Sequence, residues 1–204
     1  DGLIRAYKDF QRQGQVFFSS RQTGNALTWV ERGPNDVGGR TRAIMWDPND
    51  PNNKAVFAGG VGGGLWYCND ISAQVPSWTN VSSIFSNVAV VAVTHDPTNT
   101  QVMYYATGEA TPNADALRGA GLWKSTDGGM NWNQLPATDG SLFYYCHNMR
   151  CTPNGDLYVA STTGLYRSQD DGNSFQKVLG SGPFGALFDE MSDFDIAGNG
   201  DIYA

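Results

Sequence analysis

The sequence has few cysteines, no excess of positive charge and no long apolar run, and each shortage excludes a class of protein. Three cysteines among 204 residues are too few for a disulfide-stapled scaffold, and an odd number cannot pair completely. The longest apolar run, 88–93, is far too short to span a membrane. Acidic residues outnumber basic ones by 20 to 13, so the positive charge that drives nucleic-acid binding is missing. We expect neither a nucleic-acid partner nor a membrane span.

The three cysteines are Cys68, Cys146 and Cys151. The last two bracket one predicted strand, where an odd offset places side chains on opposite faces of a sheet. A disulfide between them is therefore not expected. We predict buried free thiols, because an unpaired cysteine behaves as a small core residue.

Histidine is equally scarce. His95 and His147 are isolated, and no metal-ligand spacing links them. Neither a Ser-His-Asp order nor a phosphate-binding glycine loop can be assembled. The glycine-rich stretch 59–64 lies between two predicted strands without a helix, which favours close backbone packing. The sequence predicts no metal and no cofactor.

The chain does contain an internal repeat. The phrase Gly-Leu-Trp/Tyr-x-x-x-Asp occurs at 64–70, 121–127 and 164–170. Each phrase lies in a longer matching block that reads strand, tight turn, strand, loop, strand, turn, strand. Self-similarity at a period of several tens of residues is typical of stacked identical units. Four-stranded sheets repeated at this spacing are β-propeller blades, so we predict an all-β propeller of antiparallel blades.

Three blades and part of a fourth are predicted, over residues 41–81, 88–135, 146–179 and 191–204. The run 88–93 has no polar alternation, which suits a strand buried on both faces near the axis. The fourth strands mix Trp, Asn, Gln and Lys, as expected at an outer edge. The predicted strands are 41–46, 55–59, 65–67 and 78–81, then 88–95, 102–107, 122–124 and 132–135, then 146–151, 157–160, 165–167 and 175–179.

The predicted ring is incomplete. Residues 29–34 read like the fourth strands, and we expect them to close the ring as the outermost strand of the final blade. Three blades and fragments cannot close alone, so further blades or copies of the same chain must complete the ring. Apolar residues at helical spacing within 1–28, ended by Gly14, predict a short leader helix. The organisation is therefore a leader over 1–28 and the N-terminal portion of a propeller over 29–204.

Two turns share the pattern Ser-x-Asp-x-Gly-x-x-Trp/Phe, which resembles the Asp-box, or BNR repeat, of sialidases, sortilin-type propellers and xyloglucanase-like glycosidases. The resemblance implies a hairpin between the third and fourth strands of a blade. In such a turn the carboxylate accepts backbone N–H groups, glycine supplies a positive φ, and the aromatic ring packs between sheets. We expect a structural role, and too few oxygen ligands gather for calcium. The matching residues are Ser125, Asp127, Gly129, Trp132, Ser168, Asp170, Gly172 and Phe175.

The first unit departs from this pattern. Cys68 stands at the serine position, Asp70 is kept, and an insertion runs to Trp78, so we expect a longer and irregular turn there. The stretch 29–44 resembles the opening of sortilin-like propellers in large secreted Bacteroidetes proteins that use type IX secretion. That resemblance implies a secreted or cell-surface protein.

Candidate functional residues lie in the loops that enter the innermost strands and join second to third strands. The longest, 108–121, is an insertion with charges of both signs, and inserted loops on rigid scaffolds often carry function. The alternative is a solvated loop that caps the channel, with Glu109 paired to Arg118. The candidate channel-face residues are Arg40, Arg42, Glu109, Asp115, Arg118, Tyr145 and His147.

We favour a non-catalytic propeller that binds a protein, peptide or glycan through this face. Glycoside hydrolysis needs two carboxylates, and the loop that carries an acid in xyloglucanase-like enzymes is glycine-rich here, at 59–64. A sialidase-like arginine triad could use Arg40, Arg42 and Arg118. The Arg-Ile-Pro signature of that family is absent, however. A hydrolase with its acids in blades outside this sequence is the alternative. An assembly or scaffold factor is the second alternative.

Overall fold

The structure, a computed structural model, describes residues 40–82, 89–110, 116–180 and 191–204. The chain divides into two units, Asp1–Glu31 and Arg32–Ala204. Every described residue belongs to the second unit. The leader helix predicted over 1–28, the closing strand predicted over 29–34 and the candidate Asp115 all lie outside the described residues.

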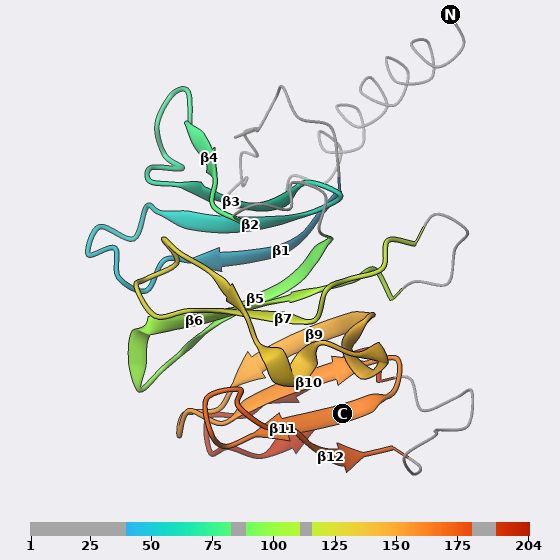
Figure 1. Cartoon of the computed structure of the whole chain (residues 1–204). Coiled ribbons are helices and arrows are strands. Elements are labelled where there is room, and N and C mark those ends of the chain that lie inside the picture. The colour runs from blue at the N-terminus through green and yellow to red at the C-terminus, as the bar shows by residue number, and fades with distance from the viewer. Residues whose placement is uncertain (1–39, 83–88, 111–115, 181–190) are drawn as a thin grey trace, which may run out of the picture. The chain divides into compact units, whose positions relative to one another are not determined.

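Three four-stranded antiparallel sheets follow one another along the chain (Figure 1), and each keeps its strands in chain order. We call them blades 1, 2 and 3, and a two-stranded terminal hairpin follows them. The predicted all-β fold of four-stranded antiparallel blades is confirmed.

The strands of blade 1 are β1 (Arg40–Trp46), β2 (Val56–Val61), β3 (Gly64–Cys68) and β4 (Trp78–Asn80). Those of blade 2 are β5 (Val90–Asp96), β6 (Asn99–Thr107), β7 (Leu122–Ser125) and β8 (Asn133–Gln134). Those of blade 3 are β9 (Cys146–Cys151), β10 (Leu157–Ser161), β11 (Gly164–Ser168) and β12 (Gln176–Leu179), and the terminal hairpin is β13 (Asp195–Ile196) and β14 (Ile202–Tyr203).

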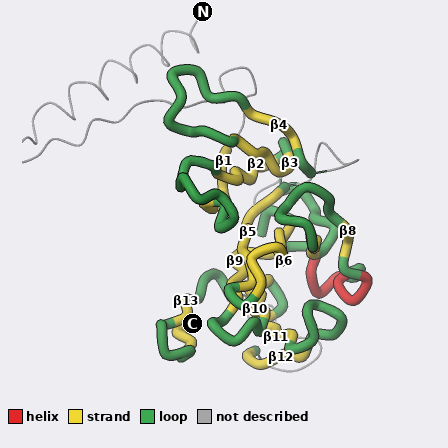
Figure 2. Tube along the Cα trace, turned by 90° about the vertical axis from the view of Figure 1, so that its left-hand side faces the viewer, coloured by secondary structure: helices red, strands yellow, loops and turns green. Residues whose placement is uncertain are grey.

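Two short 3-10 helices, η1 (Pro136–Thr138) and η2 (Ser141–Phe143), connect blade 2 to blade 3. Figure 2 shows them in red beside β8. The sequence pattern does not predict them, because a single 3-10 turn is too short to produce a helical period. Phe143 of η2 is buried between the blades and contacts the ring of Tyr166 at 5.0 Å.

The core lies between the blades. In β5, Val90 and Val93 pack on blade 1, while Val91 and Ala92 pack on blade 3. The expectation of a strand buried on both faces is confirmed, since β5 is the innermost strand of a blade with a neighbour on each side. The outermost strands β4, β8 and β12 are mostly exposed.

Each innermost strand of the three blades contains a β-bulge near its start. The register shifts between Thr41 and Ala43, between Val90 and Ala92, and opposite Ala160 and Ser161 in β9. A bulge adds one residue to one strand and so reverses the alternation of faces.

This bulge corrects the prediction for Cys146 and Cys151. Both pack against the core between blades 2 and 3, so the expectation of opposite faces is wrong. Because the bulge adds one residue to β9, Cys146 and Cys151 lie on the same side of the sheet although their offset in the sequence is odd. Both thiols are nevertheless free, as is Cys68, and burial raises the pKa of the Cys146 thiol to about 12.

The Ser-x-Asp-x-Gly turns join the third and fourth strands of blades 2 and 3. In each turn the serine hydroxyl donates to the aspartate carboxylate at 2.8 Å and accepts the glycine N–H at 2.9 Å. Gly129 and Gly172 have φ of 86° and 88°. A Cβ at these glycines would lie 2.6 Å from Phe57 and 2.5 Å from Leu135 of the preceding blade. The positive φ therefore favours glycine at both positions, and any larger residue would also have to displace a side chain of the preceding blade.

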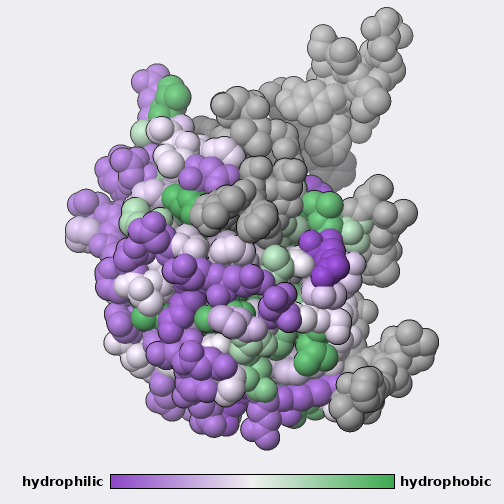
Figure 3. All heavy atoms as spheres, viewed as in Figure 1, coloured by the Kyte–Doolittle hydropathy of each residue, from purple (hydrophilic) through white to green (hydrophobic). Residues whose placement is uncertain are grey.

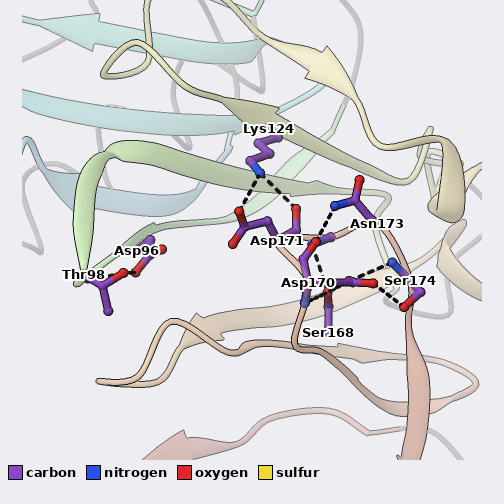
Figure 4. Close-up of polar contacts among 9 residues, drawn as sticks. Asp96, Thr98, Lys124, Ser168, Asp170, Asp171, Asn173 and Ser174 are labelled. Carbon is purple, nitrogen blue, oxygen red and sulfur yellow. Dashed lines mark hydrogen bonds and ion pairs between the residues drawn. The ribbon is translucent and has the colours of Figure 1, made fainter.

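The same turns also join neighbouring blades (Figure 4). Asp171 adopts φ of 60° at the position that Gly128 holds in blade 2 with φ of 71°. Lys124 of β7 donates to the Asp171 carbonyl at 3.1 Å and lies 3.6 Å from its carboxylate. In blade 1, the connection from β3 to β4 is longer, over residues 69–77, and Asp70 accepts the N–H of Ser72 at 2.9 Å.

Candidate binding face

The loop between β6 and β7 is fastened at its base by backbone hydrogen bonds. Gly108 donates to the carbonyl of Ala89 at 2.9 Å, and Gly119 donates to the carbonyl of Tyr144 at 2.8 Å. The Thr107 hydroxyl donates to Gly121 at 2.6 Å. These bonds tie the loop to the segment that enters β5 and to the segment that enters β9.

Both glycines at this base are required by space. A Cβ at Gly108 would lie 2.0 Å from the Tyr144 carbonyl oxygen, and one at Gly119 would lie 2.4 Å from the carbonyl carbon of Thr107. Gly108 also has φ of 97°. The two ends of the loop are therefore in direct backbone contact with each other and with the segment around Tyr144. This contact fixes where the loop begins and ends.

Glu109 lies at the meeting point of the three blades. Its carboxylate forms an ion pair with Arg40 of β1, and its side chain is 1% exposed whereas that of Arg40 is 60% exposed. Its backbone forms an isolated parallel bridge with Cys146 of β9, and its N–H donates to Leu117 at 2.8 Å. A buried carboxylate requires such a partner, because burial without one is costly. The alternative in which Glu109 pairs with Arg118 is wrong.

Arg118 instead stacks on an aromatic ring. Its guanidinium carbon lies 3.6 Å from the centre of the Tyr144 ring, within the range of a cation–π interaction. The Tyr144 backbone accepts from Gly119 next to it, so the same residue fixes both the loop and the guanidinium. The sequence analysis named Tyr145 as the candidate at this point, whereas the tertiary contact with Arg118 is made by its neighbour Tyr144.

The other candidates lie at the starts of the innermost strands, on the right-hand side of Figure 1. Arg42 is exposed and lies in the bulge of β1. His147 is half-buried in the bulge of β9. Tyr145 is half-buried and its carbonyl accepts from Thr162 at 3.1 Å. The structure thus brings Arg40 and Glu109 into contact, and the remaining candidates belong to adjoining strand ends and loops.

Two exposed leucines that the sequence pattern missed flank these residues. Leu117 lies near the end of the loop, 3.5 Å from the position that a Cβ would take at Gly62 in the turn between β2 and β3. Leu142 lies in η2, and its carbonyl accepts from Thr163 at 3.0 Å. We call Arg40, Glu109, Leu117, Arg118, Leu142 and Tyr144 the binding face. Hydrophilic side chains cover most of the surface seen in Figure 3, with small apolar patches between them.

The described charged groups of this face are largely paired with one another. Its one described carboxylate, Glu109, is already paired with Arg40. Nearby, Asp193 accepts from Asn148 at 2.6 Å. Within the described ranges, no three His, Cys, Asp or Glu side chains gather where they could hold a metal ion. Fixed guanidinium and aromatic groups suit polar and planar partners.

No protein-family model matches the chain, and no curated protein does. Among solved structures, it is similar to an ancestral GH74 enzyme, with TM-score 0.57 and 21% identity over 70% of this chain and 19% of that one. It is similar to YCF48 bound to D1 peptide, with TM-score 0.54 and 17% identity over 80% and 47% of the two chains. YCF48 from Cyanidioschyzon merolae gives TM-score 0.56 and 14% identity over 83% and 50%.

These similarities show a β-propeller fold. The chain spans half the length of these structures or less. None of the helices in the described part of the chain has the length and apolar character needed to cross a membrane.

Proposed function

We propose that the chain is part of a non-catalytic β-propeller whose binding face takes a peptide or a segment of another protein. The observation that carries this proposal is the pair of fixed guanidinium groups. Arg40 is exposed but anchored on the buried Glu109, and the guanidinium of Arg118 lies over the ring of Tyr144. Arginine and tyrosine dominate the energetics of protein interfaces, and groups held in place before binding lose little entropy when a partner arrives.

The exposed leucines and the comparisons support the same proposal. Exposed Leu117 directly precedes Arg118, and exposed Leu142 lies two residues before Tyr144, so apolar side chains adjoin the stacked pair in the sequence, a mixture typical of protein interfaces. One of the similar structures is YCF48 bound to D1 peptide. The similarity to a GH74 enzyme keeps a glycoside hydrolase as the alternative, but hydrolysis needs a second carboxylate opposite the first. The described binding face offers only Glu109, and Arg40 already neutralises it.

We also propose that the Ser-x-Asp-x-Gly turns are Asp-boxes with an architectural role. Their serine, aspartate and glycine groups are satisfied within the turn. From the resemblance of residues 29–44 to the opening of secreted sortilin-like propellers, we propose a secreted or cell-surface location. Immunodetection in the culture medium and on intact producing cells tests the location, and a protein recovered only from the cell interior would contradict it.

The binding proposal is tested by selecting peptides from a displayed random library against the purified chain. We expect selected peptides to bind the parent chain, and Arg118→Gln to weaken them by about tenfold or more, which corresponds to about 1.4 kcal/mol. The double variant Arg40→Gln/Glu109→Gln removes the other guanidinium without leaving a buried charge, and we expect a similar loss. Arg150→Gln is the matched control, because Arg150 is a half-exposed arginine that lies 3.8 Å from exposed Asp195 instead.

Two parallel assays decide between the alternatives. A glycan array and the hydrolysis of xyloglucan and of a fluorogenic sialoside are run on the same preparation. Turnover of either substrate, lost in Glu109→Gln, would contradict the non-catalytic proposal. Peptides that bind all variants equally would show that the binding face is elsewhere. A protein that co-purifies in fixed proportion would favour the assembly-factor alternative.

A further inference from the structure

The chain contains two Asn-Gly pairs, Asn154-Gly155 and Asn199-Gly200. An asparagine followed by glycine is especially prone to deamidation, because glycine has no side chain to hinder attack by its backbone nitrogen on the asparagine amide. Both asparagines are exposed. One pair lies in the turn from β9 to β10 and the other in the turn from β13 to β14, so the two can be compared directly.

The backbones of the two turns share one hydrogen bond. The N–H of Gly155 donates to the carbonyl of Thr152 at 2.9 Å, and the N–H of Gly200 donates to the carbonyl of Ala197 at 2.8 Å. The two glycines have φ of 88° and 89°. In both turns this bond must open before the glycine nitrogen can react, so it favours neither pair over the other.

The side-chain amides of the two pairs differ. The Asn199 amide donates to the Asp201 carboxylate at 2.8 Å, and its oxygen accepts the Asp201 N–H at 3.1 Å. Among the residues that the structure describes, none forms a hydrogen bond with the side-chain amide of Asn154. The Asn199 amide must therefore break two bonds before it can turn towards the glycine nitrogen, whereas the Asn154 amide can turn without breaking any.

We propose that Asn154 is a site of spontaneous deamidation in the folded chain. The Gly155 backbone nitrogen gives its proton to solvent and forms a bond with the side-chain carbonyl carbon of Asn154. The bond from that carbon to the amide nitrogen breaks, and the nitrogen leaves as ammonia with a proton from solvent. Water then opens the cyclic imide at either carbonyl, which leaves aspartate or isoaspartate. Overall, water is consumed, ammonia is released and a carboxylate replaces the amide.

The modified turn lies against blade 2. A Cβ at Gly155 would be 3.3 Å from a carboxylate oxygen of Asp96, which is buried. Isoaspartate adds a methylene group to the main chain of the turn, and both products add a negative charge to it. We therefore expect modification to loosen the contact between this turn and blade 2. The proposal is independent of what the binding face takes.

Incubation of the folded chain in warm, mildly alkaline buffer tests the proposal, with the same chain unfolded in urea as the reference. Peptide mapping by mass spectrometry follows the two asparagines separately. In urea both turns are lost, and we expect similar rates of conversion. In the folded chain we expect Asn154 to be converted about tenfold faster than Asn199, the factor that corresponds to roughly one hydrogen bond to a charged group.

Two variants are the matched controls. Asn154→Gln should nearly abolish conversion at this position, because glutamine has to form a larger ring. Asp201→Ala removes the carboxylate that holds the Asn199 amide, so we expect faster conversion at Asn199 and no change at Asn154. The proposal is overturned if, relative to the unfolded chain, folding slows conversion at Asn154 as much as at Asn199 or more.

Discussion

Single residues carry much of the local specificity, and Asp127 is the clearest case. The side chain and backbone N–H groups of Asn131, the Ser125 hydroxyl and the Met130 N–H all donate to its carboxylate. These hydrogen bonds lower the pKa of Asp127 from its ordinary 3.8 to about 2, and the bonds from Asn131 contribute most. A lowered pKa means that the charged form stabilises the fold above pH 3.8, and that this contribution is lost as the pH falls towards 2.

Asp127→Asn removes the charge and keeps the shape of the side chain. We expect the variant to be less stable than the parent at pH 7, with the difference shrinking to zero between pH 3.8 and about 2. Because the carboxylate is exposed, solvent screens the effect and we expect about 1 kcal/mol or less. Urea unfolding over this pH range measures the difference. A stability difference that stays constant over the whole range would contradict the assignment.

At the scale of elements, the loop between β6 and β7 depends on the backbone crossing at its base. Gly119→Ala would place a methyl group 2.4 Å from the Thr107 carbonyl carbon, and no flexible side chain is there to move away. We expect a loss of about 1–3 kcal/mol in the free energy of unfolding, together with weaker binding at the binding face. Gly140→Ala is the matched control, because nothing lies within 4 Å of its Cβ position. Equal stability of the two variants would show that the crossing is not rigid.

The strands were predictable from sequence because their apolar residues and turns repeat in register. The apolar run 88–93 predicted the strand that the structure shows as β5, and the repeated Gly-Leu-Trp/Tyr phrase predicted the third strand of each blade. The bulges were not predictable, because an added residue leaves no separate mark in a short pattern. The same limit explains the wrong faces for Cys146 and Cys151.

The binding face was only partly predictable for a related reason. Loop position identified Arg40, Glu109 and Arg118 as candidates, but the partner of Glu109 is 69 residues away in the sequence. Such pairings depend on how blades stack, which local propensity does not encode. The ring of Tyr144 and the leucine in η2 were missed for the same reason.

At the scale of the blade series, each blade buries its core against its neighbours. Blade 2 has a core with each neighbour, and blade 3 has one with blade 2 and one with the terminal hairpin, whereas blade 1 has a described core only on the side of blade 2. In repeated arrays, stability is approximately a sum of unit and interface terms. Local opening then costs least where a unit has one interface. Native-state hydrogen exchange should therefore show stronger protection in the inner strands of blades 2 and 3 than in those of blade 1.

Phe57→Ala tests this reasoning, because Phe57 is fully buried in the core between blades 1 and 2. Truncation of a buried phenylalanine costs about 3–5 kcal/mol, and that loss falls on the single described interface of blade 1. We expect amide protection to fall most in β1, β2 and β3, less in blade 2, and least in blade 3, which retains its core with blade 2. Hydrogen exchange followed by mass spectrometry resolves the three blades. A uniform loss of protection would contradict the additive description, since it would mean that the blades unfold as one cooperative unit.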